Sequence, residues 1–409
     1  MAVDELKVWL DEYRCRSSRP DNCLEETSYR ATRSDGRQVT VRGVHRWRDT
    51  AAVQGFLLPH FLLDYMRRLR DAGHEDFATW GGKLYDQVDF VVSDAVDRNG
   101  ALVWENCAGI AQGMEQAEFA DYFATVARVF RDHGDLRTAK GVMGHALRCL
   151  RALDTPVGVH TGGVCSGEFY CGSKRARFRP ACWFHSRGRG IATNAVHTVL
   201  NQHLHVVRDM IRMYINVGRA VDLIDPSFGT PAEVLARIED RAIAGLYQLA
   251  FSAGNNSIQR SRPPSIRQFM NYRKGIKVRP TQKHPDGNPL HYYWSFYEFD
   301  MKTGKGRNIS HQNTCHYHTH TLNLMAAIRD SLDRYASTFT STAEGWRMYE
   351  AVDALLEGAG EATGHPGSAN AIYQFYRSEA AAFKSRRQNC SGGELLTDAA
   401  LQVYSALYG

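Results

Sequence analysis

The 409-residue sequence lacks any apolar run that approaches the ~18 residues needed to span a membrane. Its first residues are charged from Asp4 onward and lack the apolar segment of a secretion signal. A strong charge of either sign is also missing, since there are 50 basic and 44 acidic residues, and no nucleic-acid-binding motif accompanies the small basic excess. We therefore expect a cytoplasmic protein without a membrane or nucleic-acid partner. The sequence leaves its oligomeric state open.

Cysteine pairs with metal-binding spacing are absent as well. None of the nine cysteines belongs to a Cys-x-x-Cys motif, and Cys165, Cys171 and Cys182 are too irregularly spaced for a zinc ribbon. An odd number of cysteines in a chain without a secretion signal favours reduced thiols. The sequence thus predicts reduced cysteines and no structural zinc at these positions.

Apolar residues recur with the period of a helix through most of the chain. Turn signals at His133-Gly134-Asp135 and at 225–229 split two pairs of long helices. The turn signal Ser34-Asp35-Gly36 separates two short β-like segments. The expected helices span 50–72, 107–132, 136–153, 192–217, 231–253, 320–336, 342–357, 368–384 and 393–407, and the expected strands span 27–33, 38–45 and 290–299.

Helices in antiparallel pairs, with short β-hairpins at one end, predict a mainly α fold of the α/α-toroid class. In such a fold an inner ring of helices surrounds a funnel, and loops carry the site. We expect an N-terminal helix and β-hairpin extension over 1–49 and an α/α-toroid catalytic domain over 50–409.

The His311–His320 cluster is the densest group of chemically active side chains, with four of the 17 histidines, Cys315 and Tyr317 in ten residues. Imidazole titrates near neutral pH and binds transition metals, so the cluster predicts proton transfer or substrate binding, a metal site, or simple packing. On a strand, alternate histidines would share one face, but three of them span about 13 Å, too far to bind one ion together. No acidic residue lies nearby in the sequence to complete a metal site.

A polar stripe follows the predicted helix 192–217. A stripe of this kind either faces solvent or lines a cavity, and short amides and imidazoles favour the cavity. Its members are Asn194, His197, Asn201, His205 and Arg208.

Two weaker patterns are also candidates for substrate binding. Gln112 and Glu115 would share a face near the start of another helix, as part of a site or as an exposed helix start. Tyr293 belongs to an aromatic strand, which is typical of core packing or of a wall on which sugar rings stack.

Several short motifs occur in an order that resembles a known family. They are Ala111-Gln112-Gly113, Thr155–Val159, Val199-Leu200-Asn201-Gln202, Tyr297-Glu298-Phe299 and Tyr317–Leu324. In this order they resemble the C-terminal α/α-toroid domain of the glucuronyl C5-epimerases of heparosan and heparan sulfate, over roughly residues 50–335. The sequence departs from the family where Gln202 replaces a glycine and where Cys182-Trp183-Phe184-His185 replaces a Tyr-Glu-Glu-Tyr-Pro-like stretch.

The resemblance implies that Tyr297 and Tyr317 are candidates for exchanging a proton at a sugar carbon. We expect His316, His318 or His320 to assist them, with His318 and His320 as the catalytic candidates. A C–H bond next to a carboxylate is a very weak acid, and a phenol with a pKa of about 10 is a suitable partner for its proton. Arginine, protonated histidine or a metal must neutralise the charge of the developing enolate. We expect substrate contacts from Gln112, Glu115, Arg187, Asn194, His197, Asn201 and Tyr293.

These patterns lead to three functional hypotheses, each with a small molecule or saccharide as ligand. The favoured one is an epimerase-like enzyme that removes and returns a proton next to a carboxylate or carbonyl on a sugar acid or small specialised metabolite, with no required cofactor. The alternative is a lyase, cyclase or oxidative enzyme of natural-product biosynthesis, in which His316, His318, His320 and His205 bind a divalent transition metal. The third is a non-catalytic, glycan-binding toroid.

Overall fold

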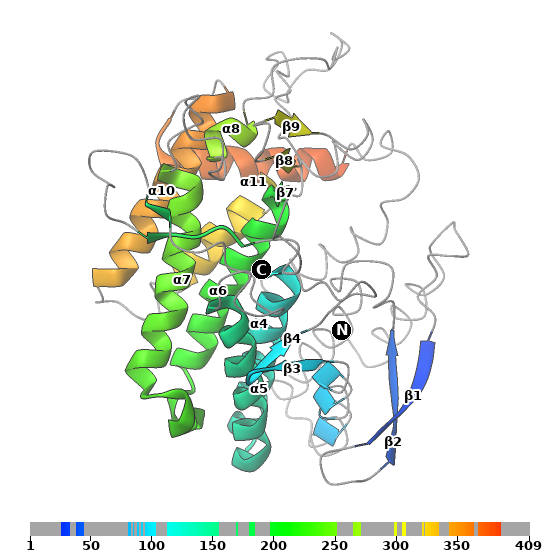
Figure 1. The fold of residues 1–409 in the computed structure, drawn as a ribbon. Coiled ribbons are helices and arrows are strands. Elements are labelled where there is room, and N and C mark those ends of the chain that lie inside the picture. Colours follow the sequence, from blue (N-terminus) through cyan, green and yellow to red (C-terminus); the bar gives the residue numbers. More distant parts are fainter. Residues whose placement is uncertain are drawn as a thin grey trace.

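The described part of the chain is mainly α-helical, as the computed structural model shows (Figure 1). The structure describes residues 26–32, 38–44, parts of 81–92, 95–103, 113–154, 169–170, 180–184, 197–251, 265–270, 298–300, 305–307, 321–322, 324–334, 343–363 and 367–385. The helices are α4 (Gly113–Asp132), α5 (Leu136–Asp154), α6 (Leu200–Gly218), α7 (Pro231–Phe251), α8 (Ile266–Met270), α10 (Ala343–Thr363) and α11 (Ala369–Ser385), and residues 324–334 are also helical. None of the described helices is long and apolar enough to cross a membrane.

The long helices form antiparallel pairs, as in an α/α toroid. The turn His133-Gly134-Asp135 joins α4 to α5, with Gly134 at φ 83°, and residues 219–230 join α6 to α7. Helices α4 and α6 lie side by side and run in the same direction. Arg131 near the end of α4 donates hydrogen bonds of 2.9 Å to the Arg219 carbonyl and to the Asp222 carboxylate, both just beyond the end of α6. The predicted mainly α fold of paired helices is confirmed.

The start of α7 follows from its local sequence. Pro231 occupies the first turn, where its missing N–H needs no partner. Thr230 and Glu233 form a capping box, because the Glu233 N–H donates to Thr230 Oγ1 (3.3 Å) and the Thr230 N–H donates to the Glu233 carboxylate (2.8 Å). These bonds satisfy N–H groups that a helix start leaves without an intrahelical partner.

The strands are short and form hairpins. β1 (Glu26–Thr32) pairs antiparallel with β2 (Gln38–Val44), which confirms the hairpin predicted around Ser34-Asp35-Gly36. β3 (Val96–Arg98) and β4 (Ala101–Val103) are joined by Asn99 and Gly100, both at positive φ (56° and 82°), as a type I′ turn requires. β5 (Phe169–Tyr170) pairs with β6 (Pro180–Ala181).

The predicted helix 192–217 begins later than expected. His197 lies in strand β7 (His197–Val199), which pairs with β8 (Glu298–Asp300), and β8 pairs in turn with β9 (Lys305–Arg307). Helix α6 starts only at Leu200. The prediction that His197 shares a helical stripe with Asn201 is therefore wrong, because a pairing with a segment about 100 residues away overrides the local helical period.

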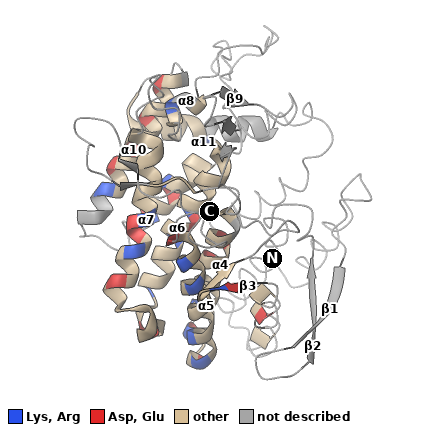
Figure 2. Ribbon diagram, viewed as in Figure 1, with Lys and Arg blue, Asp and Glu red and all other residues tan. Residues whose placement is uncertain are grey.

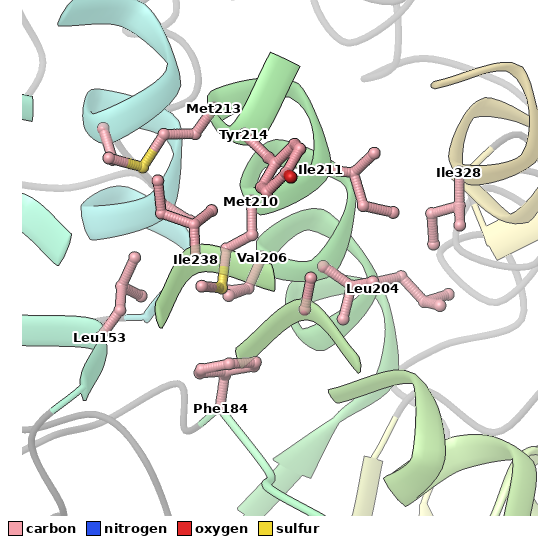
Figure 3. Packing of buried hydrophobic residues seen from close by; sticks show 14 of the residues in the cluster. Leu153, Phe184, Leu204, Val206, Met210, Ile211, Met213, Tyr214, Ile238 and Ile328 are labelled. Atoms are coloured by element: carbon pink, nitrogen blue, oxygen red, sulfur yellow. The ribbon is translucent and has the colours of Figure 1, made fainter. Parts of the chain in front are cut away.

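Helix α6 is the centre of the described core. Its residues from Leu200 to Val217 are buried at every position but one. Figure 3 shows Ile211 of α6 in the same packed cluster as Leu153 of α5, Ile238 of α7 and Ile328 of the helical segment 324–334. Burying each such side chain contributes roughly 1.5–3 kcal/mol, so α6 is held mainly by apolar contact with its neighbours.

Residues 182–184 are held against α6 and α7 by His203. The Phe184 N–H donates to His203 Nδ1 (3.1 Å), and His203 Nε2 lies 3.0 Å from the Gly245 carbonyl oxygen. Nδ1 must therefore accept and Nε2 donate, which selects the neutral imidazole. Trp183 stacks on the imidazole at a centroid distance of 4.2 Å. His203 thus has a structural role, with both ring nitrogens engaged.

Cys182 is disulfide-bonded, whereas Cys149 is a free buried thiol. Burial raises the pKa of the Cys149 thiol well above its usual range, so this thiol is unreactive. The disulfide at Cys182 departs from the prediction of reduced cysteines. Disulfides are more typical of oxidising compartments than of the cytosol, and the cytoplasmic localisation stays a prediction.

Gly245 is required by the close approach of α7 to its neighbours. A Cβ at this position would lie 2.7 Å from Val207 Cγ2 and 3.0 Å from Phe184 Cε2. We expect Gly245→Ala to lower the free energy of unfolding, since overpacking costs about 1–3 kcal/mol and a helical alanine returns at most ~1 kcal/mol. Urea-induced unfolding measures this change.

Gly141 provides a matched control for this prediction. It is also helical, but it is exposed, and a Cβ there would meet nothing within 4 Å. Gly141→Ala should therefore raise the free energy of unfolding by about 0.5–1 kcal/mol. Equal effects of the two substitutions would contradict the packing explanation.

Candidate active site

Two polar stripes meet where α4 and α6 lie side by side. Charged residues of α5 and α7 lie mostly at the surface, and Figure 2 shows basic residues along α5 and both signs along α7. On α6, by contrast, Asn201, His205, Arg208, Arg212 and Asn216 recur at helical spacing and are each at most 8% exposed. On α4, the facing stripe consists of Glu118, Asp121, Thr125 and Arg128, of which the first three are buried and Arg128 is partly buried. The solvent-facing alternative for the α6 stripe is thereby excluded for Asn201, His205 and Arg208.

Hydrogen bonds join the two stripes through Asn216. Its Oδ1 accepts from Arg128 Nη1 at 2.7 Å, and its Nδ2 donates to Asp121 Oδ1 at 2.9 Å and to Thr125 Oγ1 at 2.8 Å. The Thr125 hydroxyl in turn donates to the Asp121 backbone carbonyl at 2.8 Å. The network fixes which end of the Asn216 amide is oxygen, because only an oxygen can accept from Arg128.

A group of buried charges on α6 lies beside this network. Asp209 is fully buried and accepts a hydrogen bond of 2.7 Å from Arg208 Nε. Arg212 Nη1 lies 4.0 Å from the same Asp209 oxygen, and Arg212 Nε donates to Ser331 Oγ at 3.4 Å. The contact with Ser331 joins α6 to the helical residues 324–334.

Asp121 has the electrostatic properties of an acid–base group. Burial raises the pKa of its carboxyl from 3.8 to about 7, and nearby Asp209 raises it further, while Arg212, Arg208 and the hydrogen bond from Asn216 lower it. Its second oxygen, Oδ2, is buried and accepts no hydrogen bond from the described residues. A carboxyl with this pKa can both accept and release a proton at neutral pH, and such shifted groups cluster at functional sites.

Most residues predicted for the site lie outside the described residues: Gln112, Arg187, Asn194, Tyr293, Tyr297, His316, Tyr317, His318 and His320. Glu115 lies in the first turn of α4 and His197 in β7, but the structure does not describe their side chains. Asn201 and His205 are described, and both are buried on α6.

The described neighbours of these predicted residues converge on α6. Gln112 directly precedes α4, which lies along α6. Tyr297 directly precedes Glu298 of β8, and Glu298 pairs with Val199, the residue before α6. The predicted histidine cluster directly precedes Thr321, whose helical segment continues to Ser331 and its contact with Arg212. Three segments that are far apart in the sequence thus reach the same helix, but at different levels, since Val199 precedes its first turn whereas Arg212 and Asn216 lie in its second half.

A metal centre is not formed by the residues that the structure describes. Among them, no group of three or more His, Cys, Asp or Glu side chains could hold a metal ion. His205 is the one predicted ligand that is described, and the others, His316, His318 and His320, lie outside the described part. A divalent metal at that cluster stays a prediction.

Comparisons with known proteins do not assign a family. No family model and no curated protein matches the sequence. Among solved structures, the chain is similar to the GH76 α-mannanase of Bacteroides thetaiotaomicron, with a TM-score of 0.36 and 8% sequence identity, covering 87% of this chain and 72% of that chain. This similarity is too weak to transfer any chemistry, so we infer the chemistry of the site from its own residues alone.

Proposed function

We propose that the protein is an enzyme that moves a proton next to a carboxylate or carbonyl group on a sugar acid or small metabolite, with Asp121 as an acid–base group. The observation that carries this proposal is the buried Asp121 carboxyl, with its pKa of about 7 and with Oδ2 accepting no hydrogen bond from the described residues. Epimerisation needs a second acid–base group on the opposite face of the carbon. Tyr317, implied by the resemblance to the C5-epimerases, is the proposed second group. Tyr297 is too far away for this role, because it directly precedes Glu298, whose partner Val199 lies roughly 25 Å along α6 from Asn216 and Asp121.

The buried arginines of the cluster support an anionic substrate. Removing a proton next to a carboxylate builds up negative charge, which a catalyst stabilises with preorganised cationic groups. Arg208 and Arg212 act electrostatically on Asp121, so they lie in the region where that charge would develop. Guanidinium groups match carboxylates in geometry as well as charge. This favours a sugar acid or another carboxylate over a neutral glycan.

Solvent deuterium uptake tests the proposal. The protein is incubated in D2O with uronate-containing saccharides and with small sugar acids, and deuterium at the C–H next to the carboxylate is followed by NMR. We expect uptake by the wild type and a loss of roughly 10²–10⁴-fold in rate for Asp121→Asn, because that variant cannot exchange the proton. Tyr317→Phe should slow uptake as well.

Asp132→Asn is the matched control, since Asp132 is an exposed aspartate at the end of the same helix. Its rate should equal that of the wild type. If Asp121→Asn exchanged deuterium as fast as the wild type, Asp121 would not be an acid–base group. If Tyr317→Phe also kept the full rate, the epimerase-like reaction with these two groups would be excluded.

A further inference from the structure

A hydrogen bond of 2.9 Å connects the Asn216 side chain of α6 directly to the Asp121 carboxyl. Its amide has two N–H groups, and one serves Asp121 Oδ1 while the other serves Thr125 Oγ1. Its oxygen accepts from Arg128 at 2.7 Å, a short bond to a charged donor. Every hydrogen-bonding group of the Asn216 amide is therefore directed by a neighbour, so the amide has one orientation.

The two carboxyl oxygens of Asp121 have different surroundings. Oδ1 accepts a hydrogen bond from the Asn216 amide at 2.9 Å and a longer one from the Thr125 hydroxyl at 3.5 Å. Oδ2 accepts no hydrogen bond from the described residues, although it is fully buried. A carboxyl held by one oxygen keeps the other in a fixed position for proton transfer, which a freely rotating carboxyl could not do.

Arg128 acts on Asp121 through Asn216. The guanidinium polarises the amide by binding its oxygen, and a polarised amide is a stronger donor to the carboxylate. The other charged groups that act on Asp121 from α6 are Arg208, Asp209 and Arg212, while on α5 His145 packs against Phe123 instead. Asn216 thus binds the Asp121 carboxyl directly, and Arg128 affects Asp121 by binding Asn216.

We propose that Asn216, oriented by Arg128, is the positioning residue that fixes Asp121 through Oδ1 and leaves Oδ2 as the oxygen that exchanges the proton. This inference rests on the proposed function for its catalytic meaning. Its structural part stands on the hydrogen bonds alone and can be tested without a substrate.

Infrared spectroscopy of the whole protein tests the structural part. The carbonyl band of the protonated Asp121 carboxyl is identified by its loss in Asp121→Asn, and its pH midpoint is compared among variants. Because the Asn216 hydrogen bond lowers the pKa of Asp121, Asn216→Leu should move the midpoint to higher pH. Arg128→Met should move it in the same direction by less. The double variant should match Asn216→Leu alone, since Arg128 acts through the amide.

The double variant should also fold more readily than Asn216→Leu, because it leaves no Arg128 guanidinium without its amide partner. It therefore keeps the proposal testable if the single variant misfolds. Thr125→Val is the structural control, since it keeps the 2.9 Å bond from Asn216 to Asp121 Oδ1 and removes only the long bond of 3.5 Å from the Thr125 hydroxyl. It should leave the midpoint close to that of the wild type. An unchanged midpoint in both Asn216→Leu and the double variant would overturn the proposal.

The outcomes separate this inference from the proposed function. If Asn216→Leu shifts the midpoint and also shifts the pH profile of deuterium uptake, both stand. If the midpoint shifts but Asp121→Asn keeps full uptake, the positioning contact is real and the catalytic role of Asp121 fails. If the midpoint stays and Asp121→Asn loses uptake, the positioning role of Asn216 fails alone.

Discussion

Replacing Asp209 with leucine is expected to lower the free energy of unfolding by about 3–5 kcal/mol. Asp209 is fully buried, and its carboxylate accepts the hydrogen bond of 2.7 Å from Arg208 Nε. Arg208 is only 2% exposed, so its charge would stay in the protein interior after the carboxylate is removed. Removing one partner of a buried ion pair is costly for this reason, even where the intact pair adds little stability. Urea-induced unfolding at neutral pH measures the change.

Two comparisons make this prediction specific. Asp222 forms an ion pair with Arg131 at the surface, where the two side chains are 49% and 34% exposed. Its replacement by alanine should cost less than about 1 kcal/mol, because solvent screens such pairs. The double variant Arg208→Met with Asp209→Leu removes both charges and should recover most of the stability lost by the single change. A loss for Asp209→Leu as small as that for Asp222→Ala would contradict the buried-pair explanation.

The helix pairs could be predicted because their signals are local. The apolar period and the turn at His133-Gly134-Asp135 define α4 and α5, and Asp225 to Gly229 separates α6 from α7. The hairpin of β1 and β2 could be predicted from the turn signal Ser34-Asp35-Gly36 in the sequence between them. The strand at His197 could not be predicted in this way, since it depends on a partner near Phe299 that the local sequence does not indicate.

The candidate site was predictable only in part. The α6 stripe through Asn201, His205 and Arg208 was found from its spacing, but the facing α4 stripe was missed. Glu118 and Asp121 also recur at helical spacing, yet charged residues on a helix usually face solvent, so their spacing alone does not indicate burial. Glu118 and Asp121 are buried only because α4 packs against α6, and this burial raises the pKa of Asp121.

The stability of Asp121→Asn relative to the wild type is expected to increase by about 4 kcal/mol as the pH rises from about 4 to about 8. The pKa of Asp121 is about 7 in the folded protein, because of burial, and its ordinary value is 3.8. Well below pH 3.8 the carboxyl is protonated in both states, so the folded state has its full stability. Between the two pKa values only the unfolded state ionises, so the wild type loses stability as the pH rises. Asparagine carries no such proton and removes this loss.

A second buried group acts in the opposite direction and has to be separated from Asp121. Burial, followed by the nearby Arg148 charge, lowers the pKa of His145 from 6.5 to about 4, so this histidine contributes stability above pH 6.5 that is lost as the pH falls towards 4. Over the same pH range the two groups partly cancel in the wild type. The difference between Asp121→Asn and the wild type isolates Asp121, because both proteins contain His145. In His145→Gln the opposing contribution is gone, and stability should fall visibly from pH 4 to pH 7. If the difference between Asp121→Asn and the wild type did not change with pH, Asp121 would be ionised throughout, and the proton it is proposed to exchange at neutral pH would not be there.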